Sequence, residues 1–425
     1  MIPVYWRIYK ENFDCLAKIL HVPTTEILIS SAASGIDNIV PSTETLLFAI
    51  YFAAVVAIPP EECLQTLGHP KGELFSHYSF AVQKSFEQVS ILETHEFIVL
   101  QAFTIYLIAV QFHCSSKRLS TLTAVLVRLA QGAGIHCDGS RFGQSPFETE
   151  MRRRLWWHIR LIDARASEEA GCDATIRPGS SSTAMPLNIN DVDLTPAMTV
   201  IPASRMECTD MTFSLLRFEA ILAFEAISQC GKLGLAETID CTTRSIMRYQ
   251  NCIRELVPIQ PGQTNPFYWY TAIVSRIILN QLWLVAYYPY LQVNSYDCVS
   301  SATRDDLFST AIYIMQSQLL LYNGTPTRRW SWLCATQPPW HAMTYILTEL
   351  CKRKHGCRVE AAWNTIDSVL EHDPETDDGV RQETSFTFSA SSRLGKLWEN
   401  DFRPLNELLA SARAAKANAD TCSAI

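Results

Sequence analysis

The chain has 425 residues, of which 48% are hydrophobic and only 18% are charged. An average globular protein is about one quarter charged, so this composition excludes a chain that is mainly disordered. The 43 acidic residues outnumber the 35 Lys and Arg residues and give a net charge of −8. Without a basic excess to neutralise phosphates, non-specific binding of nucleic acid is not expected.

The 14 cysteines are scattered along the chain, and no two of them form a Cys-x-x-Cys pair. The N-terminal residues also lack the basic region and apolar run of a secretory signal. We therefore expect an intracellular chain with reduced thiols rather than a disulfide framework.

Two long uncharged stretches, residues 45–58 and 97–116, raise the question of membrane spans. The first is shorter than the roughly 20 residues that a spanning helix needs. The second contains Gln101, Gln111 and His113, whose polar groups hydrocarbon would leave unsatisfied. We therefore predict two buried core helices and no membrane partner.

The best-marked helix is predicted to start at SPFE, residues 145–148. Ser falls at the N-cap, Pro at the first helical position and Glu at the third, which predicts a capping box. Glu148 and Arg152, and likewise Glu150 and Arg154, are spaced to form ion pairs one turn apart. The RRR run at 152–154 is therefore interpreted as ion-paired and stacked on aromatic rings rather than as a phosphate site.

Helical periodicity recurs from end to end, without a convincing series of alternating strands. The predicted fold class is all-α, as a single large multi-helical domain over residues 1–371. Residues 372–425 are predicted to form an acidic linker followed by a Ser/Thr/Ala-rich C-terminal tail. A loop is expected at 172–211 and a break at 258–266. Further helices are expected at 120–133, 213–256, 267–286, 305–321, 340–353 and 358–370.

No metal or cofactor site is expected. Cys351, His355 and Cys357 have the side chains of metal ligands, but a closed zinc site needs four ligands and no second pair lies nearby. The segment NINDVD at 188–193 resembles a cation-binding loop without its glycine. It is interpreted as a polar turn that caps backbone groups.

Three polar residues, His136, Asp138 and Asp163, lie near the end of one predicted helix and on the inward side of the next. A histidine and carboxylates can perform general acid–base catalysis if they converge. Helix ends routinely recruit such groups, so structural pairing is the favoured interpretation. Nucleotide loops, serine-hydrolase elbows and zinc-peptidase motifs are missing, and the Asp-rich motifs of terpene cyclases are incomplete. We therefore lean against an enzyme.

Residues 129–194 form one recognisable unit: LAQGAGIHCDGS, then SPFETEMRRRLWWHIRLIDARASEEAG, then MPLNINDVDL. This unit resembles the fungal-specific transcription factor domain, the regulatory middle region of fungal zinc-cluster activators. Similar segments at 20–24, 46–55, 61–63 and 340–351 extend the resemblance over nearly the whole chain. The matching positions in the central unit are Gly134, His136, Asp138, Glu150, Arg152, Arg153, Arg154, Trp156, Trp157, Asp163, Arg165, Gly171, Pro186, Asn188, Asn190 and Asp191.

The resemblance implies a helical regulatory domain that senses small molecules or contacts partner proteins in the nucleus, with the cytoplasm as the alternative location. Full-length activators of the family carry an N-terminal module in which six cysteines hold two zinc ions. Because this sequence shows no such module, we expect a transcription regulator without its own DNA reader and without direct contact to nucleic acid. Its expected partners are a transcription factor or co-regulator, a small-molecule ligand, or further copies in a homo- or hetero-oligomer. Its expected role is control of a metabolic or secondary-metabolite pathway.

Two alternatives remain open from the sequence. The scaffold could serve a biosynthetic enzyme or metabolite-binding protein, in which case the polar candidates are His136, Asp138, Asp163 and Asp191. The sequence could also derive from a gene model that misses a 5′ exon, in which case a zinc module precedes it.

Overall fold

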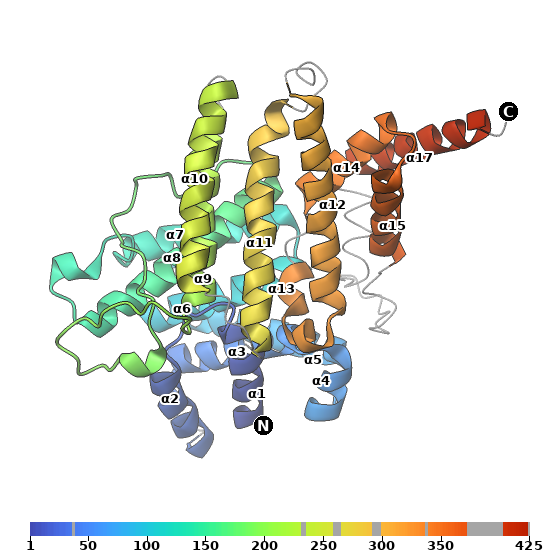
Figure 1. Cartoon of the computed structure of the whole chain (residues 1–425). Coiled ribbons are helices and arrows are strands. Elements are labelled where there is room, and N and C mark those ends of the chain that lie inside the picture. The colour runs from blue at the N-terminus through green and yellow to red at the C-terminus, as the bar shows by residue number, and fades with distance from the viewer. Residues whose placement is uncertain are drawn as a thin grey trace. The chain divides into compact units, whose positions relative to one another are not determined.

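The computed structural model describes residues 1–35, 39–230, 235–257, 265–290, 299–335, 339–371 and 403–423. These residues form helices and their connections, and no strand occurs among them, which confirms the predicted all-α fold class (Figure 1). By its internal contacts the chain forms two compact units. Unit 1 comprises Met1–Ile221 and Cys252–Gln263, and unit 2 comprises Leu222–Asn251 and Thr264–Ile425.

Unit 1 is built around two helices that are apolar on nearly every side. These are α3 (Pro41–Ala57) and α6 (Phe97–Val110), which pack against each other. Their few polar groups are satisfied internally, since Thr45 donates to the Pro41 carbonyl at 2.8 Å and Gln101 to the Ile19 carbonyl at 3.3 Å. The two uncharged stretches are therefore buried core helices, as predicted. None of the described helices combines the length and apolar character needed to cross a membrane.

The remaining helices of unit 1 surround this pair. α5 packs on α3, while α7 and α8 pack on each other and on α6. A π-helical segment, Tyr9–Asp14, follows α1, and a 3₁₀ turn covers Asp191–Asp193. The bounds are α1 Ile2–Ile8, α2 Val22–Ser34, α4 Pro60–Leu67, α5 Lys71–Gln88, α7 Ser116–Gly132 and α8 Pro146–Ala170.

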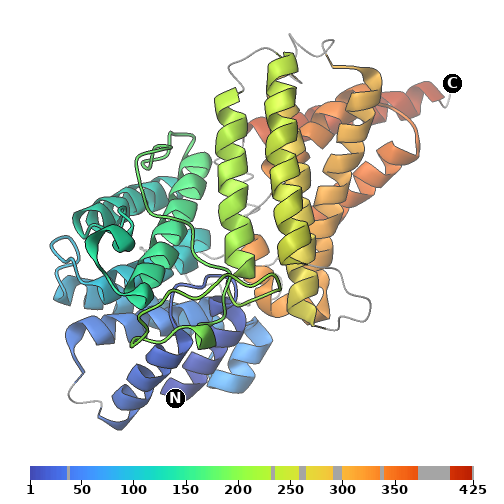
Figure 2. The same ribbon diagram turned by 60° about the vertical axis from the view of Figure 1, so that its left-hand side comes forward.

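Unit 2 holds the long helices α11 and α12, which lie side by side (Figures 1 and 2). α12 also packs against α14 and α15, and α14 packs against α17. The bounds are α11 Pro266–Tyr287, α12 Ser301–Asn323, α13 Ser331–Ala335, α14 Trp340–Lys352, α15 Cys357–Glu371 and α17 Arg403–Ser423. Of the predicted linker and tail, residues 403–423 form α17, whereas 372–402 lie outside the described residues. The domain boundary at 371 stays a prediction.

Two helices carry the chain between the units: α9 (Thr212–Cys230) and α10 (Leu235–Leu256). Cys230, the last residue of α9, forms a disulfide with Cys241 in α10. The expectation of reduced thiols throughout is therefore wrong for this pair. The two cysteines are 11 residues apart in sequence, and the two helices bring their Cα atoms to within 6.5 Å of each other. Sequence spacing alone did not predict this proximity.

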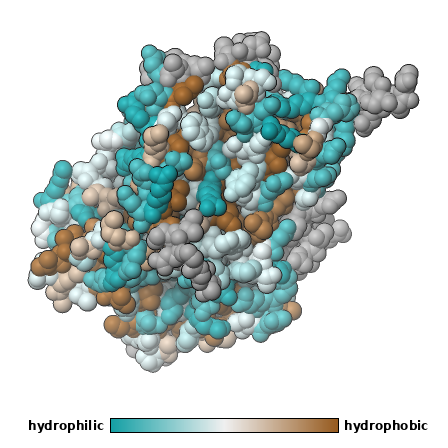
Figure 3. All heavy atoms as spheres, viewed as in Figure 1, coloured by the Kyte–Doolittle hydropathy of each residue, from teal (hydrophilic) through white to brown (hydrophobic). Residues whose placement is uncertain are grey.

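The face of the molecule drawn in Figure 3 mixes hydrophilic and hydrophobic residues without one sign of hydropathy dominating. Large side chains that are exposed in unit 2 include Met247 on α10, Trp269 on α11 and Leu320 on α12. They lie on different helices, and single exposed apolar side chains are normal on protein surfaces. We assign no function to them.

Candidate functional site

Helix α8 positions most of the residues that the sequence singled out. Its N-terminus is the predicted capping box: Ser145 accepts from the Glu148 N–H at 3.2 Å, and Glu148 accepts from the Ser145 N–H at 3.1 Å. Gly171 ends it with a φ of 65°, a left-handed conformation that favours glycine. The helix therefore starts and stops where local sequence signals place it.

A buried ion cluster of five residues joins α8 to distant parts of unit 1. It consists of Asp14, Lys18, Glu150, Arg154 and Asp191, all with side chains that are at most 5% exposed. Lys18 Nζ lies 2.5 Å from Asp14 and 2.8 Å from Asp191. Arg154 lies 2.6 Å from Asp191 and 3.3 Å from Glu150, which confirms the predicted pair with Glu150. The charges are thus paired where water cannot solvate them.

The carboxyl groups of this cluster titrate differently because their partners differ. Burial acts to raise the pKa of Asp191, but Arg154 and Lys18 outweigh it and lower the pKa to about 2. Burial raises the pKa of Asp14 to about 6 although Lys18 opposes the rise. Burial likewise raises the pKa of Glu150. With three carboxyl groups around two cations, Asp14 and Glu150 take up a proton more readily than Asp191.

A second ion pair joins α8 to the turn before it. Asp138 accepts two hydrogen bonds from Arg153, at 2.8 and 3.0 Å, a bidentate geometry. It also accepts from the Ser140 hydroxyl at 2.6 Å and the Ala184 N–H at 2.9 Å. Burial opposes ionisation, but these donors hold the pKa of Asp138 well below its usual range. Asp138 is therefore a fixed anion rather than a proton carrier.

The four acid–base candidates do not converge on one point. Asp163 accepts from the backbone N–H groups of Thr175 and Ile176 at 3.2 and 2.7 Å. His136 lies with its ring centroid 6.1 Å from that of Trp156, and its Nδ1 has no hydrogen-bond partner among the described residues.

The three carboxylates share a different task, which is to hold the long loop 172–211 against α8. Asp163 accepts from the loop backbone at residues 175–176, and Asp138 accepts from it at residue 184. Asp191 is itself part of the loop and binds Arg154 of α8.

The NINDVD segment is a polar turn, as interpreted. The Asn190 N–H donates to Asp193 at 2.9 Å, and the Asn190 side chain accepts from the Asp210 N–H at 3.0 Å. Asn188 donates to the carbonyls of Arg205 and Glu207 at 2.8 and 2.9 Å. No group of three or more His, Cys, Asp or Glu side chains is arranged to hold a metal ion in the described part of the chain.

Sequence reasoning missed three members of this region: Asp14, Lys18 and His21. His21 caps α2, with Nδ1 3.0 Å from the Thr24 hydroxyl, and its Nε2 lies 2.9 Å from the Asp191 carbonyl oxygen. Burial lowers the pKa of His21, so the neutral ring is favoured. Only His21 lies in a segment that resembles the family, at residues 20–24, and that resemblance did not indicate which residues His21 contacts.

A pocket of about 330 Å³ opens beside His21, between α2, α6 and the first turns of α8. Its volume is at the lower end of the range for small-molecule sites, about 300–1,000 Å³. Apolar side chains dominate its wall. The lining residues are Leu20, His21, Thr24, Thr25, Leu28, Leu46, Phe97, Ile98, Gln101, Phe147, Glu148, Met151 and Arg152.

Arg152 is the cation of this pocket. One of its nitrogens donates to the Ala133 carbonyl at 3.2 Å, and its guanidinium lies 5.9 Å from the centre of the Phe97 ring. The predicted pair of Arg152 with Glu148 does not form, because Glu148 is used by the capping box. A guanidinium has five N–H donors, so most of those on Arg152 remain available to a ligand acceptor.

None of the four acid–base candidates lines the pocket. Asp191 is coupled to it through His21, which touches the pocket on one side and the Asp191 carbonyl on the other. The pocket and the buried ion cluster are thus neighbours within unit 1. His21 lines the pocket and also contacts Asp191 of the cluster. The site as a whole combines a largely apolar pocket with an adjoining network of buried ion pairs and hydrogen bonds.

Residues 4–232 match the family described as the fungal specific transcription factor domain. The chain belongs to this family. The match contains the capped helix α8, the ion cluster and the pocket, so the site lies within the family's own region of the chain. This confirms the family that the sequence resembles.

Three relatives are informative. The chain is 30% identical to the aurofusarin cluster transcription factor aurR2 of Gibberella zeae, over 87% of the chain and 56% of the relative. It is 28% identical to the transcriptional regulator AacuB of Aspergillus aculeatus, over 85% and 50%, respectively. It is also 28% identical to the pyriculol/pyriculariol biosynthesis cluster transcription factor 1 of Pyricularia oryzae, over 87% and 51%. The chain spans about half the length of these curated relatives.

Proposed function

We propose that this chain is the regulatory part of a transcription regulator that controls genes of a fungal secondary-metabolite pathway, and that it works in the nucleus. The observation that carries the proposal is the family match over residues 4–232. It is supported by relatives whose names describe transcription factors of the aurofusarin and pyriculol/pyriculariol clusters.

The proposed mode of action is binding of a partner or a small molecule rather than contact with DNA by the described helices. The net charge of −8 disfavours neutralisation of phosphates by this chain. A partner transcription factor or co-regulator would supply the contact to promoters. The pocket in unit 1 would supply the response to a metabolite.

The ligand class that suits the pocket is a compact, largely apolar molecule with one acceptor or anionic group. Phe97, Phe147 and Met151 offer apolar and polarisable surface, and Arg152 offers N–H donors at the edge. A charge-assisted hydrogen bond to Arg152 would fix the orientation of the ligand, and burial of its apolar part would supply most of the affinity.

The route from pocket to regulatory output would start at His21. A ligand against His21 and Thr24 would act on the N-cap of α2 and on the carbonyl of Asp191. Asp191 anchors the loop 172–211 through Arg154 and Lys18. We propose that occupancy of the pocket stabilises one conformation of this loop, and that a partner protein binds this conformation.

The enzyme alternative receives no support from the arrangement of its candidates. Asp138, Asp163 and Asp191 are each held by fixed donors, and His136 lies against Trp156. Groups that are occupied in this way stabilise structure rather than transfer protons. We therefore propose binding rather than catalysis.

Deletion of the gene combined with RNA sequencing tests the regulatory role. We expect transcripts of a set of biosynthetic genes to change, and a fluorescently tagged copy that restores them to accumulate in the nucleus. Unchanged transcripts together with loss of a metabolite would instead favour a cytosolic role in biosynthesis.

Binding of the anionic aromatic dye 1-anilinonaphthalene-8-sulfonate tests the pocket. Leu28→Trp fills the pocket from α2 and is expected to weaken dye binding about tenfold. Ile27→Trp is the matched control, since Ile27 is the neighbouring residue and is 72% exposed. Arg152→Gln is expected to weaken binding of the anionic dye and to leave the affinity for a neutral aromatic probe unchanged. Equal dye affinity in the wild type and Leu28→Trp would show that the dye binds elsewhere.

A further inference from the structure

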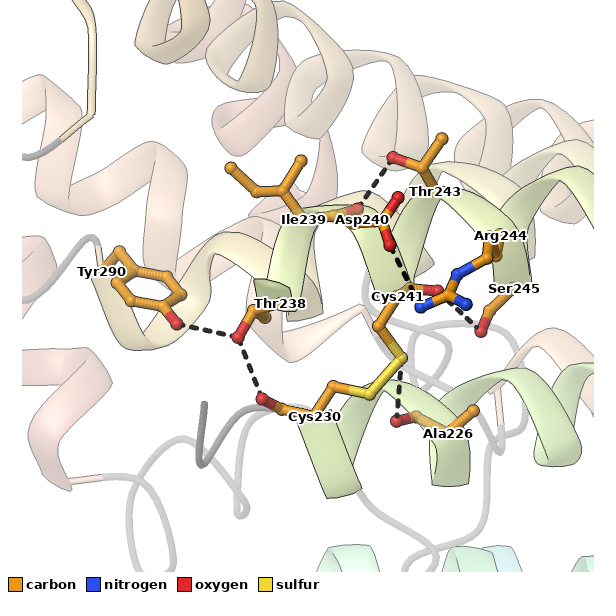
Figure 4. The surroundings of a disulfide bond; sticks show 10 residues. All are labelled: Ala226, Cys230, Thr238, Ile239, Asp240, Cys241, Thr243, Arg244, Ser245 and Tyr290. Carbon is orange, nitrogen blue, oxygen red and sulfur yellow. Dashed lines mark hydrogen bonds and ion pairs between the residues drawn. A yellow bond between two sulfur atoms is a disulfide. The ribbon is translucent and has the colours of Figure 1, made fainter. Parts of the chain in front are cut away.

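The disulfide between Cys230 and Cys241 links the C-terminal end of α9 to the second turn of α10 (Figure 4). No other disulfide occurs among the described cysteines, and the sequence has no Cys-x-x-Cys pair. Both members of the disulfide are only partly buried. The bond therefore belongs to one specific cysteine pair that is not fully buried.

Hydrogen bonds hold the same two helix ends together independently of the sulfur atoms. The Thr238 hydroxyl donates to the Cys230 carbonyl at 2.9 Å, and the Tyr290 hydroxyl donates to Thr238 at 3.0 Å (Figure 4). These bonds tie α9, α10 and the turn after α11 within unit 2. After reduction of the disulfide, the two thiols would remain neighbours, which is the condition for rapid reformation of the bond.

We propose that Cys230 and Cys241 form a reversible redox pair, oxidised by a peroxide and reduced by a dithiol. In the oxidation, a thiolate of one cysteine attacks the peroxide O–O bond and becomes a sulfenic acid, and hydroxide leaves with a proton from solvent as water. The second thiol attacks that sulfur, the disulfide forms, and a second water leaves. In the reduction, a dithiol attacks one sulfur, forms a mixed disulfide and then closes on itself, which returns both thiols.

The position of the pair gives the oxidation a structural consequence. α9 and α10 are the two helices that run from one compact unit into the other. The disulfide fixes their ends to each other and restricts the separation of the α9–α10 hairpin. A nucleus or cytosol keeps thiols reduced, so in those compartments the pair would be open at rest and would close under oxidative stress.

Differential alkylation tests the proposal on the purified full chain. The chain is equilibrated in buffers with varied ratios of oxidised to reduced dithiothreitol, free thiols are capped with N-ethylmaleimide, and capping at each cysteine is measured by mass spectrometry. As the proportion of oxidised dithiothreitol rises, Cys230 and Cys241 are expected to lose capping together, in one two-electron transition. They should regain it together as the proportion falls. The exposed Cys172 should stay fully capped across the same range. Addition of hydrogen peroxide to the reduced chain should close the same pair.

Variants separate the redox pair from a general effect on folding. Cys241→Ser should leave Cys230 capped at every ratio, whereas Cys172→Ser should leave the transition unchanged. Hydrogen–deuterium exchange in the peptides around Cys230 and Cys241 should be slower in the oxidised wild type than in the reduced wild type, with no such difference in Cys241→Ser. Full capping of both cysteines after peroxide treatment would overturn the proposal, and so would a disulfide that no dithiothreitol ratio opens in the folded chain.

Discussion

Asp191 is the residue on which most of the described site depends. It binds Arg154 and Lys18 through its side chain, accepts from the Val22 N–H at 2.8 Å, and accepts from His21 through its carbonyl. Burying an unpaired charge at this depth would cost much free energy. The ion pairs therefore matter mainly because each charge compensates the burial of its partner. The sequence marked Asp191 as a candidate acid–base residue, whereas its contacts make it an anchor.

Asp191→Asn tests this role. The substitution keeps the size of the side chain but leaves Arg154 and Lys18 with less compensation, so we expect a loss of about 3–5 kcal/mol in the free energy of unfolding. Asp193→Asn in the same turn is the control. Its pair with Arg205 is partly exposed, and we expect a loss of about 1 kcal/mol. Urea denaturation followed by circular dichroism measures both, and similar losses would contradict the anchor role.

Asp14 is expected to make stability depend on pH in the opposite direction from Asp191. Its pKa rises from an ordinary value of 3.8 to about 6 in the folded chain, mainly because of burial. A raised pKa contributes stability at low pH that is lost as the pH rises through the folded-state value. Asp14→Asn cannot ionise, and Lys18 keeps Asp191 as a partner in this variant.

We therefore expect the free energy of unfolding of the wild type, relative to Asp14→Asn, to fall by about 2 kcal/mol between pH 4 and pH 6. Denaturation of both proteins across this range gives the difference directly, and contributions from other titrating groups cancel. If the stability difference between the two proteins is constant, or if the wild type gains stability relative to Asp14→Asn as the pH rises, the pKa of Asp14 is not raised in the folded chain.

At the scale of the element, α8 is the helix that carries most of the site residues of unit 1. Its capping box, its proline at the first position and its terminal glycine are all local signals, and all three were predictable. Ser145→Ala removes the cap and is expected to cost about 1 kcal/mol of stability. Ser76→Ala, on the exposed surface of α5, is the control and should change stability by less than about 0.5 kcal/mol. A thermal denaturation midpoint that is unchanged in Ser145→Ala would contradict the assigned cap.

The helices and the long loop were predictable because periodicity, caps and glycines act over a few residues. The ion cluster was predictable only in part. The Glu150–Arg154 pair is one turn apart on a single helix, whereas Lys18 and Asp191 meet only through the tertiary fold. The pocket escaped prediction for the same reason, since its wall combines residues of α2, α3, α6 and α8. The Cys230–Cys241 disulfide could not be predicted without knowing that α9 and α10 place the two cysteines side by side.

At the scale of the whole molecule, the chain forms two compact units, and the family match covers residues 4–232. The pocket and the ion cluster lie in unit 1, and the disulfide lies in unit 2. A metabolite response and a redox response would therefore be separate inputs to one regulator. Variants of Leu28 should alter the first without affecting the second, and Cys241→Ser should do the reverse.

The most direct test of the proposed regulator is complementation of a deletion strain, with transcripts of the affected biosynthetic genes as the readout. The wild type and Ile27→Trp are expected to restore these transcripts, while Leu28→Trp at equal protein level is not, because its pocket is filled. Transcripts that do not respond to the deletion would contradict the regulatory role. Full restoration by Leu28→Trp would contradict control through the pocket.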